Sequence, residues 1–169
     1  EGRISVIPNF ARKLLIANQI PPFDRGKKTF IAAGRFTHEK GFDLLISAFH
    51  QSALSTDDWQ LIILGDGPER PALESMVQDL GISGQIQLPG TVASPEEWFV
   101  HVDAFVLPSR YEGFPNALME AMACALPCIA FDCQSGPADI IEHRVNGLLV
   151  PPEDTQALSE AMIHIAKNP

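Results

Sequence analysis

The stretch Leu61-Ile62-Ile63-Leu64-Gly65-Asp66-Gly67-Pro68 decides the fold class. Its first four residues form an uninterrupted apolar run, and its last four residues favour turns. A short apolar run without polar alternation is typical of a strand that is buried on both faces, as strands in parallel sheets are. We therefore interpret this stretch as an inner strand that ends in a tight turn.

Strand and helix patterns alternate in both directions from this stretch. Predicted helices connect the predicted strands, and Ser94, Asn116 and Asp154 are their expected N-caps. Repeated strand–helix units of this size predict an α/β fold, a Rossmann-like doubly wound parallel sheet of about six strands. The other predicted strands are 29–33, 86–88, 104–107, 128–131 and 148–150, and the predicted helices are 41–49, 71–80, 95–100, 116–124 and 155–166.

Composition narrows the classes of function. The chain has 169 residues, of which 46% are hydrophobic, enough for one domain with a substantial core. A formal net charge of -9, without a Lys/Arg cluster, argues against a nucleic-acid partner. The three cysteines, Cys124, Cys128 and Cys133, have no disulfide or zinc-site spacing and are expected to be buried free thiols.

The predicted topology gathers several loops at one rim. In open parallel sheets, ligands bind beyond the carboxyl ends of the strands. Residues that are far apart in the sequence are therefore expected to meet in one cleft there. The segments that follow predicted strands are 34–41, 65–68, 89–92, 108–116 and 132–136.

The first rim segment carries two cations, Arg35 and Lys40, beside the start of a predicted helix. Arginine forks onto phosphate oxygens, lysine supplies a point charge, and helix amides add donors, so this pattern suits a diphosphate. From the residues alone, two solvated surface cations are the alternative interpretation.

The segment 108–121 carries two carboxylates, Glu112 before Gly113 and Glu120 inside the predicted helix. Carboxylates accept hydrogen bonds from sugar hydroxyls, and free helix amides donate to phosphate oxygens. Both side chains are expected at an exposed rim. A glutamate in a first helical turn can also serve only to complement the helix dipole, and that alternative stays open.

The sequence EGFPNALMEAMACALPCIAFD, with seven residues between its first two glutamates, strongly resembles the donor-domain signature of the retaining glycosyltransferases of family 4, which have the GT-B fold. The stretch GRFTHEKGFDLLISAF resembles the diphosphate-binding segment of that family. LIILGDGPERPALE, IQLPGTV and NGLLVPPED follow the family's order, and VIPNF resembles the start of its second domain. One departure is Ala125 at a helix end, where most relatives have glycine.

The resemblance implies a role for each matching residue. Arg35 and Lys40 would hold the diphosphate and neutralise the leaving group, so with Glu112, at the transferred sugar, they are the expected catalytic residues. Glu120 would hold the ribose hydroxyls. The other expected donor-binding residues are Gly113, Phe114, Pro115 and Asn116 around the sugar and β-phosphate, Ala117 and Leu118 at the phosphates, and Thr91 and Val92 near the nucleobase.

The resemblance also implies a function. Residues 1–169 would be one nucleotide-sugar-binding domain, cut from a longer protein whose N-terminal domain binds the acceptor. That protein would be a metal-independent, hexosyltransferase-like enzyme that uses a UDP- or GDP-linked sugar in glycan, glycolipid or polysaccharide biosynthesis. We expect it in the cytoplasm or peripherally at the cytoplasmic face of a membrane, and we expect the isolated fragment to be inactive. A sugar-nucleotide epimerase of GT-B-like architecture and a non-catalytic nucleotide-sugar-binding module are the alternatives.

Overall fold

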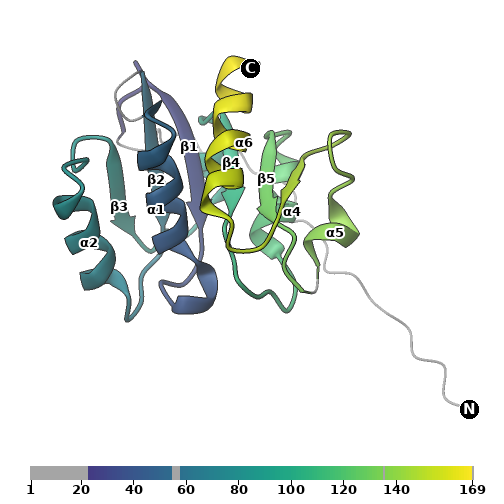
Figure 1. The fold of residues 1–169 in the computed structure, drawn as a ribbon, viewed down its shortest axis with the longest axis horizontal. Coiled ribbons are helices and arrows are strands. Elements are labelled where there is room, and N and C mark those ends of the chain that lie inside the picture. Colours follow the sequence, from purple (N-terminus) through teal and green to yellow (C-terminus); the bar gives the residue numbers. More distant parts are fainter. Residues whose placement is uncertain (1–22, 55–57, 135, 169) are drawn as a thin grey trace, which may run out of the picture.

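A parallel sheet forms the centre of the computed structural model, which describes residues 23–54, 58–134 and 136–168. The described residues form six strands in the order β3-β2-β1-β4-β5-β6 (Figure 1), and every neighbouring pair is parallel. This arrangement confirms the predicted doubly wound α/β fold. The strands are β1 (Lys28–Ala33), β2 (Trp59–Leu64), β3 (Ile86–Gly90), β4 (Ala104–Leu107), β5 (Cys128–Phe131) and β6 (Leu148–Val150).

Helices cover both faces of the sheet. The helices α1 (Phe42–Gln51), α2 (Arg70–Asp79) and α6 (Thr155–Lys167) pack on one face, and α3 (Glu96–Phe99) and α4 (Asn116–Ala123) pack on the other. Two further short helices, η1 (His38–Lys40) and α5 (Pro137–Ile140), follow β1 and β5. Sequence patterns did not predict these two. Three or four residues are too few to show a helical period, and neither segment carries a glutamate pair like Glu96 and Glu97, which indicated α3.

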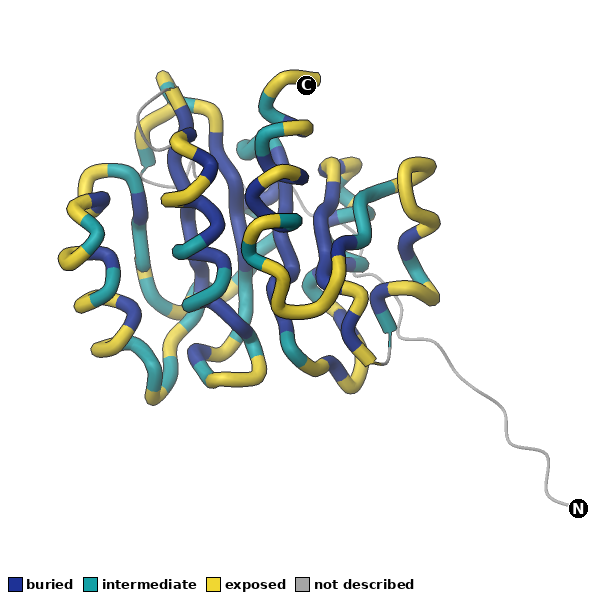
Figure 2. Tube along the Cα trace, in the orientation of Figure 1, coloured by how far each residue is buried: buried dark blue, intermediate teal, exposed yellow. Residues whose placement is uncertain are grey.

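Alternating strand residues fill the two cores. In β1, Phe30 and Ala32 belong to the core beneath α1 and α6, whereas Ile31 belongs to the core beneath α4. All six residues of β2 are buried, as its uninterrupted apolar run predicted. Figure 2 shows the buried strands between helices that are exposed on their outer sides. Each face of the sheet is therefore covered within this chain.

Two of the three predicted helix caps are wrong. Helix α3 begins after Pro95 rather than Ser94, and α4 begins after Pro115. No side chain caps either helix. Proline has a fixed φ that suits the first turn of a helix, so it can start one without a side-chain cap. The third prediction is confirmed, because the Asp154 carboxylate accepts a hydrogen bond from the amide of Ala157 at 2.9 Å.

Helix α4 ends in a left-handed residue, as expected from the position of Ala125. Its φ is 60°. The amide of Ala125 donates to the carbonyl of Met122, and the amide of Leu126 donates to the carbonyl of Ala121. These two bonds form the Schellman motif that ends many helices, usually with glycine at the left-handed position.

The strand order places a switch point between β1 and β4. The chain winds outward from β1 through β2 and β3, and from β4 through β5 and β6. Segments 34–41 and 108–116 leave the carboxyl ends of these two central strands at the lower edge of the view in Figure 1. Ligands of open α/β sheets bind at such a point. The match to VIPNF lies outside the described residues.

Candidate functional site

The loops after β1 and β4 are in direct contact, as the topology predicted. Gly41 has a φ of +64°, and a Cβ atom at this position would lie 2.0 Å from the carbonyl oxygen of Pro108. The amide of Arg110 donates to the carbonyl oxygen of Glu39 at 2.8 Å. Only glycine allows the two main chains to approach this closely in this conformation. The contact brings the segment with Arg35 and Lys40 beside the segment with Glu112.

Glu112 accepts hydrogen bonds from both loops. The Lys40 ammonium donates to its Oε1 at 2.6 Å, and the Ser109 hydroxyl donates to the same oxygen, also at 2.6 Å. Glu112 is only 4% exposed, so the expectation that it lies at an exposed rim is wrong. Its burial follows from the contact between the loops and is tolerated because a cation and a hydroxyl pair with the carboxylate.

The Arg110 guanidinium joins its own loop to η1, to α1 and to the residues before α6. It donates to both carboxylate oxygens of Asp43, at 2.8 and 2.6 Å, to the carboxylate of Glu153 at 3.0 Å, and to the carbonyl of His38 at 2.8 Å. Burial alone would raise the pKa of the Asp43 carboxyl, but the hydrogen bonds and charge of Arg110, together with main-chain hydrogen bonds at Leu44 and Asp43, lower that pKa. The hydrogen bond to Asp43 is the main cause that raises the pKa of Arg110.

Sequence reasoning assigned no role to Ser109 or Arg110, although both lie inside the segment 108–121. Their position directly after a buried strand was the available signal. Ser109 bonds to Glu112 on the same loop, but Glu112 is also paired with Lys40 from the other loop. The partners of Arg110 come from η1, from α1 and from the residues before α6. Such pairs depend on tertiary structure and do not show in the local pattern.

A cavity of about 300 Å³ opens beside these loops at the carboxyl ends of β1 and β2. The exposed side chain of Arg35 borders it, together with Thr91 and Val92. The structure thus brings together three predicted site residues from two separate rim segments, 34–41 and 89–92. The remaining lining residues are Gly34, Leu64, Gly65, Asp66 and Pro95.

Arg70 supports the far wall of this cavity. Its guanidinium donates to the carbonyl oxygens of Gly65 and Leu88, at 3.1 and 3.3 Å, and forms ion pairs with Asp66 and Glu74. These bonds join the turn after β2 to β3. The turn therefore has a defined conformation where it borders the cavity.

The start of α4 offers fewer amides than the sequence suggested. The amide of Asn116 donates to the carbonyl of Phe114, and the amide of Leu118 donates to the carbonyl of Pro115. Among the described residues, the amide of Ala117 has no hydrogen-bond acceptor. The Leu118 side chain is fully buried, so only its main chain can reach the rim. Glu120 is half-buried, one turn inside the helix.

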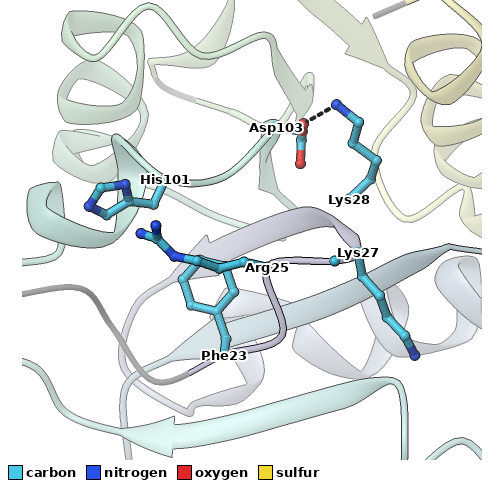
Figure 3. A pocket seen from close by; sticks show the side chains of 7 residues that line it. Phe23, Arg25, Lys27, Lys28, His101 and Asp103 are labelled. Atoms are coloured by element: carbon cyan, nitrogen blue, oxygen red, sulfur yellow. Dashed lines mark hydrogen bonds and ion pairs between the residues drawn. The ribbon is translucent and has the colours of Figure 1, made fainter.

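A second cavity, also of about 300 Å³, lies at the opposite edge of the sheet. It is bordered by Phe23, Arg25, Lys27, Lys28 and the loop before β4 (Figure 3). The Lys28 ammonium pairs with the Asp103 carboxylate at 2.8 Å. None of the predicted site residues borders this cavity, and the amino ends of β1 and β4 open onto it.

The prediction of buried free thiols holds for two of the three cysteines. All three are free, and Cys128 and Cys133 are buried while Cys124 is half-buried. Burial raises the pKa of the Cys128 thiol to about 12. Within residues 23–54, 58–134 and 136–168, no three His, Cys, Asp or Glu side chains gather as a metal site requires. No helix in those ranges is long and apolar enough to span a membrane.

The fold and the rim together define a Rossmann-like α/β domain with cations and a buried carboxylate at its switch point. Residues 27–168 match the family model described as Glycosyl transferases group 1. The match covers most of the chain, and the chain belongs to this family.

Three similar proteins illustrate the relationship. An exopolysaccharide phosphotransferase of Streptomyces coelicolor is 36% identical over 89% of this chain and 17% of its own length. A lipopolysaccharide 1,6-galactosyltransferase of Salmonella typhimurium is 36% identical over 79% of this chain and 38% of its own length. The pneumococcal O-GlcNAc transferase GtfA, solved with UDP and GlcNAc, has a TM-score of 0.77 and 29% identity over 85% of this chain and 30% of that chain.

These likenesses confirm the predicted Rossmann-like fold of GT-B glycosyltransferases. They also show a glycosyltransferase domain with relatives in polysaccharide and lipopolysaccharide biosynthesis. The chain spans 17% to 48% of the length of the curated relatives that it matches.

Proposed function

We propose that this chain is the donor-binding domain of a retaining glycosyltransferase of family 4, and that it binds a UDP- or GDP-linked sugar. The observation that carries the proposal is that Arg35, which borders a cavity of about 300 Å³, and the Lys40–Glu112 pair lie at the same rim. A cavity for a nucleoside next to cations for a diphosphate is what such a donor requires. The similar pneumococcal transferase is solved with UDP and GlcNAc, which supports the same class of ligand here.

Arg35 and Lys40 act on the diphosphate in this proposal. As the bond between the sugar and the diphosphate breaks, negative charge gathers on the departing nucleoside diphosphate. Fixed cations stabilise that charge most in the transition state, and losing one such group typically costs about 3 kcal/mol of activation free energy. No metal ion is required for this step. In the structure Lys40 is paired with Glu112, so the diphosphate competes with Glu112 for the ammonium.

The two carboxylates have different partners in the donor. Glu112 contacts the transferred sugar together with residues 113–116, and Glu120 accepts hydrogen bonds from the ribose hydroxyls. The amide of Ala117 donates to a phosphate oxygen, with Leu118 beside it, and Thr91 and Val92 flank the nucleobase. Position supports these roles, because all of these residues lie on or beside the rim that follows β3 and β4.

The domain works with an N-terminal domain of the same protein, which supplies the acceptor side of the cleft. The exposed aromatic side chains of Tyr111 and Phe114 stand beside the site and suit contact with that domain or with the acceptor. We place the whole enzyme in glycan, glycolipid or polysaccharide biosynthesis, in the cytoplasm or at the cytoplasmic face of a membrane. Its acceptor side is missing here, so the chain alone binds the donor without transferring the sugar.

Calorimetric titration of this chain with UDP, GDP and uridine tests the proposal. Arg35→Ala and Lys40→Ala should each weaken binding of the nucleoside diphosphate about tenfold or more, because hydrogen bonds to charged groups contribute about 1.5–3 kcal/mol. Binding of uridine should change little, since it carries no phosphate. Lys27→Ala, at the opposite edge of the sheet, is the control and should change neither ligand. Equal losses for diphosphate and nucleoside would show that Arg35 and Lys40 act on the fold.

A second pair of variants tests the placement of the carboxylates. Glu120→Gln should weaken UDP and the UDP-sugar alike. Glu112→Gln should leave UDP bound at least as tightly, because it releases Lys40 for the diphosphate, but should weaken the contact to the sugar and lower turnover of the full-length enzyme. The opposite pattern would contradict the placement.

Mass analysis of the full-length reaction separates the classes of function. A glycosylated acceptor indicates a transferase, an epimerised donor indicates an epimerase, and an unchanged donor indicates a binding module.

A further inference from the structure

We propose that Arg110 is a positioning residue that sets the affinity for the diphosphate through Lys40, without contacting the donor itself. The inference rests on the proposed function, because it concerns how tightly a diphosphate binds. Arg110 holds the loop that carries Lys40 against the loop that carries Glu112. It therefore fixes the place from which the ammonium reaches its ligand.

Arg110 forms hydrogen bonds to the loop that carries Lys40 through both its side chain and its main chain. Its guanidinium donates to the carbonyl of His38 at 2.8 Å, and its amide donates to the carbonyl of Glu39 at 2.8 Å. His38 and Glu39 directly precede Lys40 and belong with it to η1. Both anchors are main-chain carbonyls, so they constrain the path of the loop rather than the position of a flexible side chain.

The guanidinium also ties this loop to two helices. Asp43 lies in the first turn of α1 and accepts two bonds, and Glu153 precedes α6 and accepts one. The Arg110 side chain is only 14% exposed. A planar, bidentate pair of this kind restricts rotation more than a single contact does. Arg110 thus anchors η1 to the packed body of the domain.

The donor count argues that Arg110 is not itself a phosphate ligand. A guanidinium has five N–H donors, and four of them already donate within the chain: one to Glu153, two to Asp43 and one to His38. The Lys40 ammonium, by contrast, pairs with Glu112. An incoming diphosphate can replace that partner while the anchors of Arg110 stay in place.

Glu112 lies two residues after Arg110 on the same loop. When Arg110 holds η1, it also fixes the separation between Lys40 and the carboxylate that pairs with it at 2.6 Å. Arg110 therefore determines both the reach of the ammonium and the competitor that a ligand must displace. Loss of its side chain should affect diphosphate binding chiefly by freeing Lys40 to adopt other positions.

Amide hydrogen exchange tests the structural half of this inference without any ligand. The described sheet has both faces covered and its own core, so the 169-residue chain is a suitable sample. Arg110→Met should speed exchange of the Lys40 and Gly41 amides about tenfold or more and leave the strand β2 unchanged. Arg110→Lys should behave like Arg110→Met, because an ammonium cannot form the fork to Asp43.

A double-mutant cycle with UDP as the probe tests the functional half. Arg110→Met should weaken binding of UDP about tenfold when Lys40 is present, but less than about twofold when Lys40 is already replaced by methionine. Uridine should bind all four chains equally. Arg70→Met is the matched control, since Arg70 is also a half-buried arginine with two carboxylate partners, and its effect should be the same in both backgrounds.

The outcomes separate the two proposals. If the wild-type chain binds no nucleoside diphosphate, the proposed function fails, and the exchange data alone decide whether Arg110 positions the loop. If the wild-type chain binds UDP and Arg110→Met binds it equally well, the positioning role is overturned. An equal loss in the presence and absence of Lys40 also overturns it, because Arg110 would then act directly or through the whole fold.

Discussion

Replacing Gly41 with alanine should destabilise the chain far more than a glycine-to-alanine change usually does. Two costs add at this position. An alanine with a φ of +64° is in the left-handed region, which costs about 1–2 kcal/mol. Its Cβ would also lie 2.0 Å from the main-chain carbonyl oxygen of Pro108, and relieving such overpacking costs about 1–3 kcal/mol. The expected total is about 2–5 kcal/mol, a large part of the stability of a typical domain of about 5–15 kcal/mol.

Gly81→Ala is the matched control for the backbone term. Gly81 has a nearly identical φ of +70°, but a Cβ atom there would meet nothing within 4 Å. Gly81→Ala should therefore lower the free energy of unfolding only through left-handed backbone strain. The expected loss is about 1 kcal/mol, because the lower entropy of the unfolded alanine variant offsets part of that strain. The difference between the two variants isolates the contact between the loops after β1 and β4.

Urea unfolding followed by far-ultraviolet circular dichroism measures both free energies of unfolding. At about 2–4 °C per kcal/mol for a domain of this size, Gly41→Ala should lower Tm by roughly 4–20 °C. Gly41→Ala should also weaken binding of UDP, because relieving the overlap with the Pro108 carbonyl moves Lys40 away from Glu112. If Gly41→Ala and Gly81→Ala lost the same stability, the close approach of Gly41 to Pro108 would not exist in solution.

Three further predictions concern stability, pH and reactivity. Ala125→Gly should stabilise the chain by about 0.5–1 kcal/mol in urea unfolding, because glycine removes the left-handed strain at a φ of 60°; a loss of stability would refute this account of the α4 terminus. Burial opposes the shift, but Arg110 lowers the pKa of the Asp43 carboxyl from its ordinary value of 3.8. This carboxylate therefore contributes stability that is present above pH 3.8 and is lost as the pH falls through the lower pKa of the folded state. Asp43→Asn should therefore flatten the fall in unfolding free energy below about pH 4, whereas an unchanged profile would contradict the pairing. With its pKa raised to about 12, Cys128 should resist iodoacetamide at pH values where the half-buried Cys124 is labelled, as peptide mass analysis would show; faster labelling of Cys128 would mean that it is not buried.

The sequence was sufficient for the sheet because each strand carries a local signal. The runs in β2 and β5 are apolar without alternation, and glycine, proline or aspartate follows them closely. Strand and helix order then fixes a parallel sheet with few alternatives. The helix starts were harder to predict, because Pro95 and Pro115 begin helices without a side-chain bond, whereas the nearby Ser94 and Asn116 are preferred caps on average.

The site was only partly accessible to the same reasoning. Topology was enough to place Arg35, Lys40 and Glu112 on one rim, because the loops after parallel strands share an edge. It could not show that Glu112 is buried against Lys40 and Ser109, since that depends on the approach of Gly41 to the β4–α4 loop. The partners of Arg110 were likewise hidden, because Asp43 and Glu153 lie far from it in the sequence.

One measurement tests the central claim most directly: the change in backbone amide chemical shifts when the isotope-labelled chain is titrated with UDP. The account predicts saturable changes that cluster at residues 34–41, at Thr91 and Val92, and at 112–120, around the cavity that Arg35 borders. The cavity of Lys27 and Lys28 at the opposite edge (Figure 3) serves as the internal control and should show none. Changes confined to that opposite cavity, or no saturable change anywhere, would contradict the assignment of this rim as the donor site.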